Sequence, residues 1–270
     1  MKKKIAWMAM AVATACTVLT GCGGAEEVAS ASASEGGVDL VYAVETGSAG
    51  EAIAAEKGYK TNSVASQADA LMEVASGTSD AAIIDLLMAG AMIGEGTSYP
   101  GLVHTDELTT EEYGVGCRKG SDLASYINAV FAESYADGSM KETATTYGVQ
   151  EALVEQAPAE FTASAADSDV AYIQEKGSLI VGITEFEPMD YKDASGEWVG
   201  FDADMARMVA DKLGVEAQFV IIDWDNKIME LDSKNIDVVW NGMTLTNEVK
   251  EAMACTNPYC NNAQVVVVPK

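Results

Sequence analysis

The stretch "IDVVWNGMTLTNEVKEAM", residues Ile236 to Met253, decides the fold that we expect for this chain of 270 residues. Its apolar run, Ile236 to Trp240, predicts a buried strand that ends at Asn241-Gly242. A polar segment, Thr244 to Asn247, then leads into a predicted helix. A buried strand followed by a polar turn and a helix is typical of α/β sheets, which bind ligands at the carboxyl ends of their strands.

The same pattern recurs in two blocks of the sequence. The first block runs from the strand in "VDLVYAVETGSAGEAIAAEKG", through a helix that Gly58 ends, to the buried strand in "SDAAIIDLL". The second block contains "SLIVGI", "GFDADMARMVADKLG" and "AQFVII" before the opening stretch. Alternating strands and helices predict largely parallel sheets. We therefore expect two α/β lobes with a ligand cleft between them.

The first residues have the features of an export signal. Three lysines, residues 2–4, precede a short apolar stretch, and "LTGC" matches the lipobox of bacterial lipoproteins. We expect a signal peptide at residues 1–21 and acylation of Cys22, which would anchor the protein to the membrane. An ordinary signal peptide with an incidental cysteine is the alternative. Residues 22–37, rich in Gly, Ala, Ser and Glu, predict a flexible tether.

Charge and cysteine content exclude several classes of function. The formal net charge of −26 argues against binding to nucleic acid or to anionic lipid. His104 is the only histidine and the chain has no CxxC motif, so a metal site or a histidine-based triad is not expected, and neither is a cofactor. Cys255 and Cys260 could form a disulfide across Pro258 or remain buried thiols, and Cys117 stays unassigned.

In the second block, three predicted strands end in polar or aromatic residues. Because the carboxyl ends of parallel strands share one edge of a sheet, these residues can converge on a small amphipathic molecule with an ammonium group. A structural reading is also open, in which Trp224 covers the core and Phe186 holds its loop. The candidate ligand-binding residues are Phe186, Trp224, Asn241, Gly242 and Thr244.

In the first block, Thr46, Gly47 and Ser48 precede a predicted helix whose amino end can bind an anion, or they simply cap it. Asp85 ends the buried strand "AAIID", where a carboxylate needs a partner or a cleft unless it caps the next helix. Glu45 and Glu185 are further carboxylates near the expected cleft, and Glu185 is also a candidate ligand-binding residue. No nucleophile–base pair accompanies them, so we expect a binding protein rather than an enzyme.

The motifs "GEWVGFDAD", "DWD", "NGMTLT" and "EEYGVGCRKG" together resemble the extracellular solute-binding proteins of polar amino acid ABC transporters, family 3. The resemblance covers almost all of the chain after residue 37. It implies a two-lobed fold of the type II periplasmic-binding-protein class. The segments occur in exchanged order, so the resemblance also implies a circular permutation with its junction near residues 150–168. On this mapping the small lobe is residues 38–111, the large lobe is residues 112–270, and one strand, 112–119, joins them.

The resemblance assigns roles to individual positions. It implies that Phe186 and Trp224 sandwich the ligand side chain and that Asp85 pairs with its α-ammonium group. The helix start at Ser48 and Ala49 would donate N–H groups to the ligand carboxylate, and the turn from Asn241 to Thr244 would hold both ends of the ligand. Where the family has an arginine for that carboxylate, this chain has Val249. This loss favours an amine over a free amino acid.

We therefore expect a monomeric, lipid-anchored binding subunit of an ABC importer on the extracytoplasmic face of a bacterial membrane. It would capture an amino acid or related amine and pass it to the membrane permease. A receptor that senses the ligand without transporting it is one alternative. An enzyme of the cyclohexadienyl dehydratase type, using Glu45 and Glu185, is another.

Overall fold

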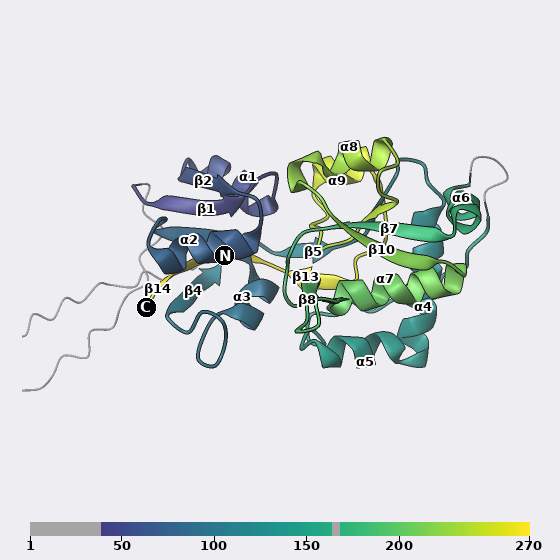
Figure 1. Ribbon diagram of the computed structural model, residues 1–270, viewed down its shortest axis with the longest axis horizontal. Helices are drawn as coiled ribbons and strands as arrows, with labels where there is room; N and C mark the ends of the chain where they lie inside the picture. Colours follow the sequence, from purple (N-terminus) through teal and green to yellow (C-terminus); the bar gives the residue numbers. More distant parts are fainter. Residues whose placement is uncertain (1–38, 164–167) are drawn as a thin grey trace, which may run out of the picture. The chain divides into compact units, whose positions relative to one another are not determined.

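The computed structural model describes residues 39–163 and 168–270, which form two α/β lobes, each built on a five-stranded sheet (Figure 1). The predicted two-lobed α/β fold is thus confirmed. We call the lobe around the first sheet the small lobe and the lobe around the second sheet the large lobe. Residues 1–21 and 22–37, the predicted signal peptide and tether, lie outside the described residues, as do residues 164–167 of the predicted linker.

The small-lobe sheet has the strand order β2-β1-β3-β14-β4, and three helices cover it. Its first three strands are parallel, whereas β14 runs antiparallel to both of its neighbours. All five residues of β3 are buried, which explains the apolar run from Ala81 to Ile84. The elements are β1 Val41–Glu45, α1 Ala49–Lys57, β2 Lys60–Val64, α2 Gln67–Ser76, β3 Ala81–Asp85, α3 Leu86–Met92, β4 Leu102–Glu107 and β14 Gln264–Pro269.

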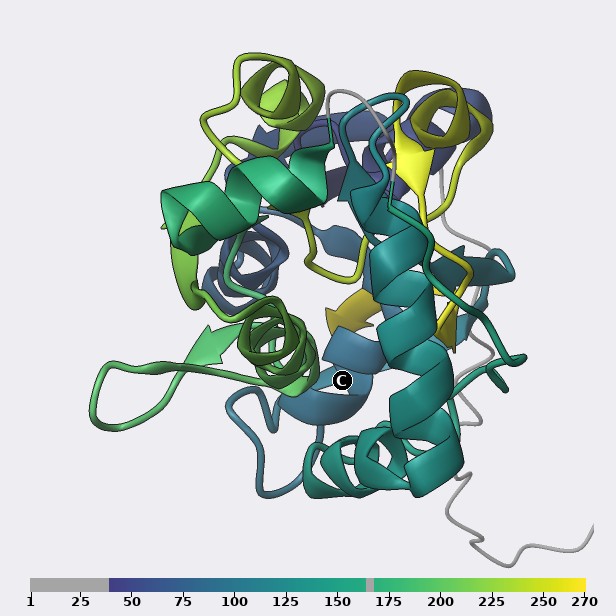
Figure 2. The same ribbon diagram turned by 90° about the vertical axis from the view of Figure 1, so that its right-hand side faces the viewer.

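The large-lobe sheet has the order β10-β7-β11-β6-β12. Helices α4 and α7 pack against each other beside it (Figure 2), and the buried face of α7 repeats every four residues, as its sequence predicts. The elements are β6 Gly116–Cys117, α4 Leu123–Asp137, α5 Ser139–Thr146, α6 Asp169–Lys176, β7 Ser178–Ile183, the hairpin β8 Tyr191–Lys192 and β9 Trp198–Val199, α7 Phe201–Leu213, β10 Glu216–Ile221, η1 Trp224–Asn226, α8 Lys227–Asp232, β11 Val238–Val239, α9 Asn247–Ala252 and β12 Ala254–Cys255.

A buried charge network fastens α6 to the large-lobe sheet. The Arg118 guanidinium donates to Asp169 at 3.0 Å, to the Ile236 carbonyl at 2.8 Å and to Asp237 at 3.2 Å. Lys176 forms a second ion pair with Asp237 at 2.6 Å. Because both aspartates are paired and hydrogen-bonded, removing Arg118 would leave buried charge uncompensated. The network therefore holds the chain in place where it re-enters the lobe after the linker.

The chain crosses between the lobes twice. Strand β5 (Glu111–Tyr113) leads from the small lobe to the large one, and β13 (Cys260–Asn262) leads back, paired antiparallel to β5. The predicted large lobe, residues 112–270, is therefore wrong at its end, since β14 belongs to the small-lobe sheet. The expectation of a single connecting strand is wrong for the same reason. A sequence such as "AQVVVVPK" shows that a strand is buried, but not which sheet takes it.

Within the described residues, no helix has the length and apolarity that crossing a membrane requires. The three cysteines in those ranges, Cys117, Cys255 and Cys260, are free thiols. Cys117 is paired across the sheet with Ala254, and Cys255 with Gly116. Since alternate residues of a strand face opposite sides, the side chains of Cys117 and Cys255 point to opposite faces of the sheet. Of the two alternatives for Cys255 and Cys260, the structure shows the one without a disulfide.

Candidate functional site

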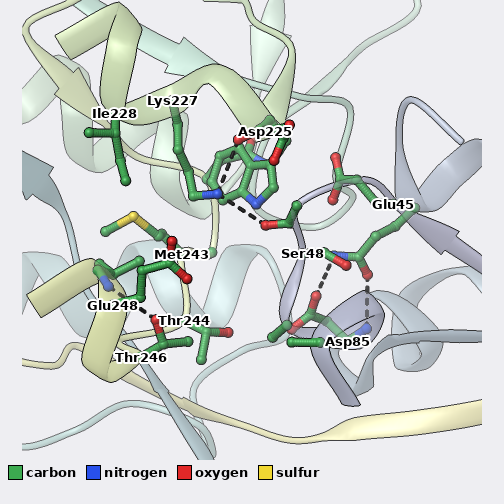
Figure 3. A pocket seen from close by; sticks show the side chains of 18 of the residues that line it. Glu45, Ser48, Asp85, Asp225, Lys227, Ile228, Met243, Thr244, Thr246 and Glu248 are labelled. Carbon is green, nitrogen blue, oxygen red and sulfur yellow. Dashed lines mark hydrogen bonds between the residues drawn. The ribbon is translucent and has the colours of Figure 1, made fainter. Parts of the chain in front are cut away.

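A cavity of about 360 Å³ lies between the lobes and is lined by residues from both (Figure 3). From the small lobe it takes the end of β1, the start of α1, Gln67 and the end of β3. From the large lobe it takes η1, the start of α8 and the turn between β11 and α9. Seven of the predicted ligand-binding residues line it, namely Ser48, Ala49, Asp85, Trp224, Asn241, Gly242 and Thr244.

The start of α1 forms one part of the small-lobe wall. The Ser48 hydroxyl accepts a hydrogen bond from the Glu51 N–H at 3.1 Å, and the Glu51 carboxylate accepts one from the Gly47 N–H at 2.7 Å. Ser48 is thus an N-cap, the alternative role considered from the sequence, and it also lines the cavity. The remaining N–H groups of the first turn have no partner inside the helix, so this wall carries partial positive charge.

Asp85 forms the opposite part of the same wall. Its carboxylate accepts hydrogen bonds from the Tyr113 hydroxyl at 2.6 Å, from the Gln264 amide at 2.9 Å, and from the amides of Gln67 and Asn262. Burial raises the pKa of Asp85 to about 7, with Glu111 adding to the rise and the hydrogen bonds from Tyr113, Gln67 and Asn262 opposing it. Asp85 does not cap α3 with its side chain, so the capping alternative is wrong. The four donors fix the carboxyl group at the cavity.

Glu45 is a buried carboxyl group at the end of β1. Burial raises its pKa to about 8, and the negative charge of Asp85 adds to the rise, whereas Lys227 and hydrogen bonds from Thr184 and Gln67 oppose it. Its Oε1 atom has no hydrogen-bond partner among the described residues. Glu45 is therefore protonated in part near neutral pH and can receive a donor from a ligand.

The turn after β11 forms the large-lobe wall. The Asn241 side chain accepts from the Thr184 N–H at 3.0 Å and donates to the Thr184 hydroxyl at 2.9 Å, which ties the turn to the end of β7. Gly242 has a φ of +57°, and its N–H donates to Asp202 at 2.6 Å. The Thr244 hydroxyl donates to Glu111 at 3.1 Å. These bonds hold the turn in one conformation at the cavity.

Lys227, the first residue of α8, reaches across the cavity. Its ammonium group donates to the Gly47 carbonyl of the small lobe at 3.0 Å and to the Trp224 carbonyl at 3.1 Å (Figure 3). The ammonium lies 5.0 Å from the centre of the Trp224 ring. Burial lowers the pKa of Lys227, and Glu45, Asp225 and other acidic groups oppose that effect.

Three predicted ligand-binding residues do not line this cavity. Phe186 is 1% exposed and packs edge-on against Tyr113 with ring centres 6.2 Å apart, so it holds its loop. Thr46 and the exposed Glu185 line a neighbouring space of about 700 Å³ between the lobes. The Thr46 hydroxyl donates to the Val64 carbonyl at 3.1 Å. Glu45 and Glu185, the pair considered for an enzyme, thus face different cavities.

Gln67, Lys227 and Glu248 line the cavity but were not among the predicted site residues, whereas Glu45 was predicted only as a carboxylate near the cleft and as a possible catalytic acid. For Lys227 a signal was available. A lysine at the first position of a helix lies against the positive end of the helix dipole, where a cation is unfavourable unless a ligand or a carboxylate compensates. Gln67 has no such signal, because its role depends on the contact with Asp85 that only the fold creates.

Five ionisable groups line the cavity, four carboxyl groups (Glu45, Asp85, Asp225, Glu248) and the ammonium of Lys227. In residues 39–163 and 168–270, no group of three or more His, Cys, Asp or Glu side chains could hold a metal ion. The arrangement can therefore bind a small molecule that carries an amine, with Trp224 as an apolar surface beside it.

Comparison with known proteins finds similarity over one part of the chain. Residues 179–270 match the family described as bacterial extracellular solute-binding proteins, family 3. The L-cystine-binding protein TcyJ of Escherichia coli is 34% identical over 99 residues, which are 36% of this chain and 37% of that protein. Cyclohexadienyl dehydratase of Pseudomonas aeruginosa is 27% identical over 104 residues, covering 38% of this chain and 39% of that protein.

Among solved structures, an ancestral cationic amino acid solute binding protein is 39% identical over 31% of this chain and 37% of that chain, with a TM-score of 0.30. The matched part of this chain therefore spans well under half the length of the curated relatives that it matches.

Proposed function

Because the chain is related through residues 179–270 to the bacterial extracellular solute-binding proteins, family 3, we propose that it captures an amino acid or related amine for an ABC importer. The observation that carries this proposal is the cavity between the lobes, lined by seven predicted ligand-binding residues. Its volume of about 360 Å³ suits a small metabolite. The bound solute would then pass to a membrane permease.

The proposed location follows from the sequence. Acylation of Cys22 would hold the protein at the outer side of the cell membrane, with residues 22–37 as the tether and one copy of the chain as the working unit. Labelling cells with a radioactive fatty acid should label the wild-type protein. The Cys22→Ala variant should lose the label and leave the membrane fraction.

A thermal-shift screen of the protein against amino acids, amines and short peptides tests the proposed binding. A ligand present at 100 times its Kd stabilises the folded state by about 2.7 kcal/mol, which is a clear rise in Tm. Asp80→Asn, outside the cavity, should respond like the wild type, whereas Thr244→Val should respond less. If no amino acid or amine raises the Tm, capture of this class of solute is wrong.

An enzymatic function of the cyclohexadienyl dehydratase type is a second candidate, supported by one relative and by Glu45. A carboxyl group with a pKa of about 8 remains protonated at neutral pH, as a general acid must. Incubation with prephenate, followed by NMR of the products, decides between the two. Turnover that Glu45→Gln abolishes would establish an enzyme. A sensor would bind the same solutes, but cells lacking it would take them up normally.

A further inference from the structure

Lys227 is a buried cation whose charge no carboxylate neutralises directly. The side chain lines the cavity and is 9% exposed. Among the described residues, no Asp or Glu oxygen lies within 4.0 Å of its ammonium group, although Arg118, Lys176 and Arg207 all have such partners. Two backbone carbonyls accept from the ammonium, which has three N–H donors, so one donor remains for a ligand.

The ammonium group of Lys227 lies beside a second source of positive charge, which is the start of α1. Gly47, whose carbonyl accepts from Lys227 at 3.0 Å, immediately precedes Ser48, the N-cap of α1. The ammonium of the large lobe and the helix start of the small lobe therefore meet at one end of the cavity. Asp85 and Glu45 line the cavity from the small lobe, and their carboxyl groups can accept hydrogen bonds from a ligand ammonium group.

We propose that Lys227 binds the carboxylate of the ligand. It would thus take the role of the arginine that the family has at the position of Val249. The proposal rests on the proposed function and narrows it, since it makes the ligand an amino acid rather than a decarboxylated amine. Val249 lines the same cavity but is packed in an apolar cluster with Trp224 and Ile228. The cation that binds the carboxylate is thus supplied by α8 rather than by α9. On this proposal, the arginine missing at Val249 no longer favours an amine over an amino acid.

A purely structural role for Lys227 predicts something different. If its bonds to Gly47 and Trp224 served only to hold the lobes together, removing the side chain would weaken every ligand equally and lower the Tm. If the ammonium is kept for a ligand carboxylate, Lys227→Met leaves the Tm of the unliganded protein unchanged or raises it, because an unpaired buried charge opposes folding. It also affects only ligands that carry a carboxylate.

The experiment compares each amino acid with its decarboxylated amine by calorimetric titration. The pairs are L-arginine with agmatine, L-ornithine with putrescine, and L-leucine with 3-methylbutylamine. Three variants accompany the wild type: Lys227→Met, Lys227→Arg and, as a matched control, Lys250→Met, which removes an exposed lysine beside Val249. Circular dichroism and Tm confirm that each variant is folded. Lys227→Gln replaces Lys227→Met if the latter does not fold.

The wild type should bind at least one amino acid roughly 10- to 100-fold more tightly than the matching amine, as expected for one charge-assisted hydrogen bond. Lys227→Met should abolish that preference with little change for the amine, whereas Lys227→Arg and Lys250→Met should keep it. If amines bind the wild type as well as amino acids do, or if Lys227→Met keeps the preference, the role of Lys227 is refuted and the proposed function stands. If no compound of either kind binds, both are refuted.

Discussion

At the scale of single residues, the cavity depends on carboxyl groups that the fold has moved out of water. Asp85 is surrounded by four donors, and Glu45 has one oxygen with no partner among the described residues. Substitution of these two groups should therefore affect the stability of the protein differently. Asp85 is part of a satisfied network, whereas Glu45 is stable in its place chiefly because it can be neutral.

Asp85→Asn should destabilise the protein and weaken amine binding. The new amide group would point a donor at the amides of Gln67, Asn262 or Gln264, which are donors themselves, so at least one buried hydrogen bond is lost. We expect a loss of about 1–3 kcal/mol in the free energy of unfolding, measured by urea titration. Asp80→Asn, which changes an exposed residue just before β3, is the control, and equal effects of both changes would contradict this account.

The stability of the unliganded protein should fall as the pH rises from about 5 to 8.5. The pKa values of Glu45 and Asp85 are raised to about 8 and about 7, so the folded state keeps protons that the unfolded state releases near pH 4 to 5. Stability is thus full below the unfolded pKa and is lost as the pH passes through the folded pKa. Tm measured over this range should fall less in Glu45→Gln than in Glu56→Gln, which changes an exposed residue of α1.

The affinity for an amine ligand should depend on pH in the opposite sense to the stability, because the positive charge of the amine favours the ionised forms of Glu45 and Asp85. Binding then releases a proton, and affinity rises with pH between about 6 and 8. Calorimetry in two buffers of different ionisation enthalpy measures that proton. Uptake of protons on binding would be the opposite of what this site requires.

The sequence predicted Asp85 at the site, since a carboxylate that ends a buried strand must have a partner or a cleft. It did not predict the contributions of Gln67 and Lys227. The neighbours of Gln67 give no sign that α2 reaches the end of β3. The place of Lys227 at a helix start signals that its charge needs compensation, but not that Gly47 lies opposite it. Phe186 does not line the cavity, because an aromatic ring beside a proline can pack inward as easily as toward a ligand.

At the scale of elements, the turn between β11 and α9 depends on a close approach to its surroundings. A β-carbon on Gly242 would lie 2.5 Å from a ring carbon of Phe186, and the φ of +57° is unfavourable for other residues. Asp202 accepts from the Gly242 N–H at 2.6 Å and from the Tyr259 hydroxyl at 2.7 Å. The turn is thereby connected to the chain just before β13.

Gly242→Ala should lower both the Tm and the ligand affinity. The strained φ and the contact with Phe186 together should cost about 1–3 kcal/mol, or several degrees in Tm. Gly90→Ala is the matched control, because Gly90 lies in α3 with no atom near its β-carbon position, and alanine there should be neutral or stabilising. Equal Tm values for the two variants would refute a special role of the turn.

The sequence predicted most elements closely, because periodicity and capping residues are local signals. The sequence predicts helices at Gln67–Ser76 and Ser139–Thr146, which are the bounds of α2 and α5, and Gly58 ends α1 as expected. The sequence predicts that the helix after this strand starts at Ala89, whereas α3 starts at Leu86, because the leucines after Asp85 look like a continuation of the apolar strand. Strand pairing was harder to predict from the sequence, because partners such as β5 and β13 lie far apart along the chain.

At the scale of the whole molecule, the two connecting strands and the close contact of the lobes determine how a ligand is enclosed. A β-carbon on Gly47, in the small lobe, would lie 2.7 Å from the Asp225 α-carbon in the large lobe. The lobes can meet at this point only with glycine on one side. Their approach is guided by β5 and β13 rather than by one strand.

Gly47→Ala should weaken ligand binding by roughly 10-fold or more while leaving each lobe folded. Gly58→Ala is the control, because its φ of +69° imposes the same strain but nothing lies within 4 Å of its β-carbon position. Small-angle scattering should show compaction of the wild type with a bound ligand and less compaction of Gly47→Ala. If both variants lose affinity equally, backbone strain rather than lobe contact explains the loss.

The proposed circular permutation makes a prediction about chain order. Val267 of β14 pairs with Ala82 of β3, and the Asp80 N–H donates to the Val41 carbonyl at 3.0 Å, so β14 ends at the edge of the sheet where β1 begins. A chain that starts at Ser168, joins Lys270 to Asp39 by a short linker and stops at Ala163 should fold and bind like the original. Failure to fold would show that residues 164–167 must remain joined.

The place of β14 has a consequence for the timing of folding. In the small-lobe sheet β4 is hydrogen-bonded to β14, and β14 alone connects it to β3. During synthesis or export, every other strand of both sheets appears before β14 does. The small lobe therefore remains incomplete while the large lobe can already assemble, and its closure must await a contact between distant parts of the chain. If the signal peptide proposed for residues 1–21 directs export of an unfolded chain, such a delay is an advantage.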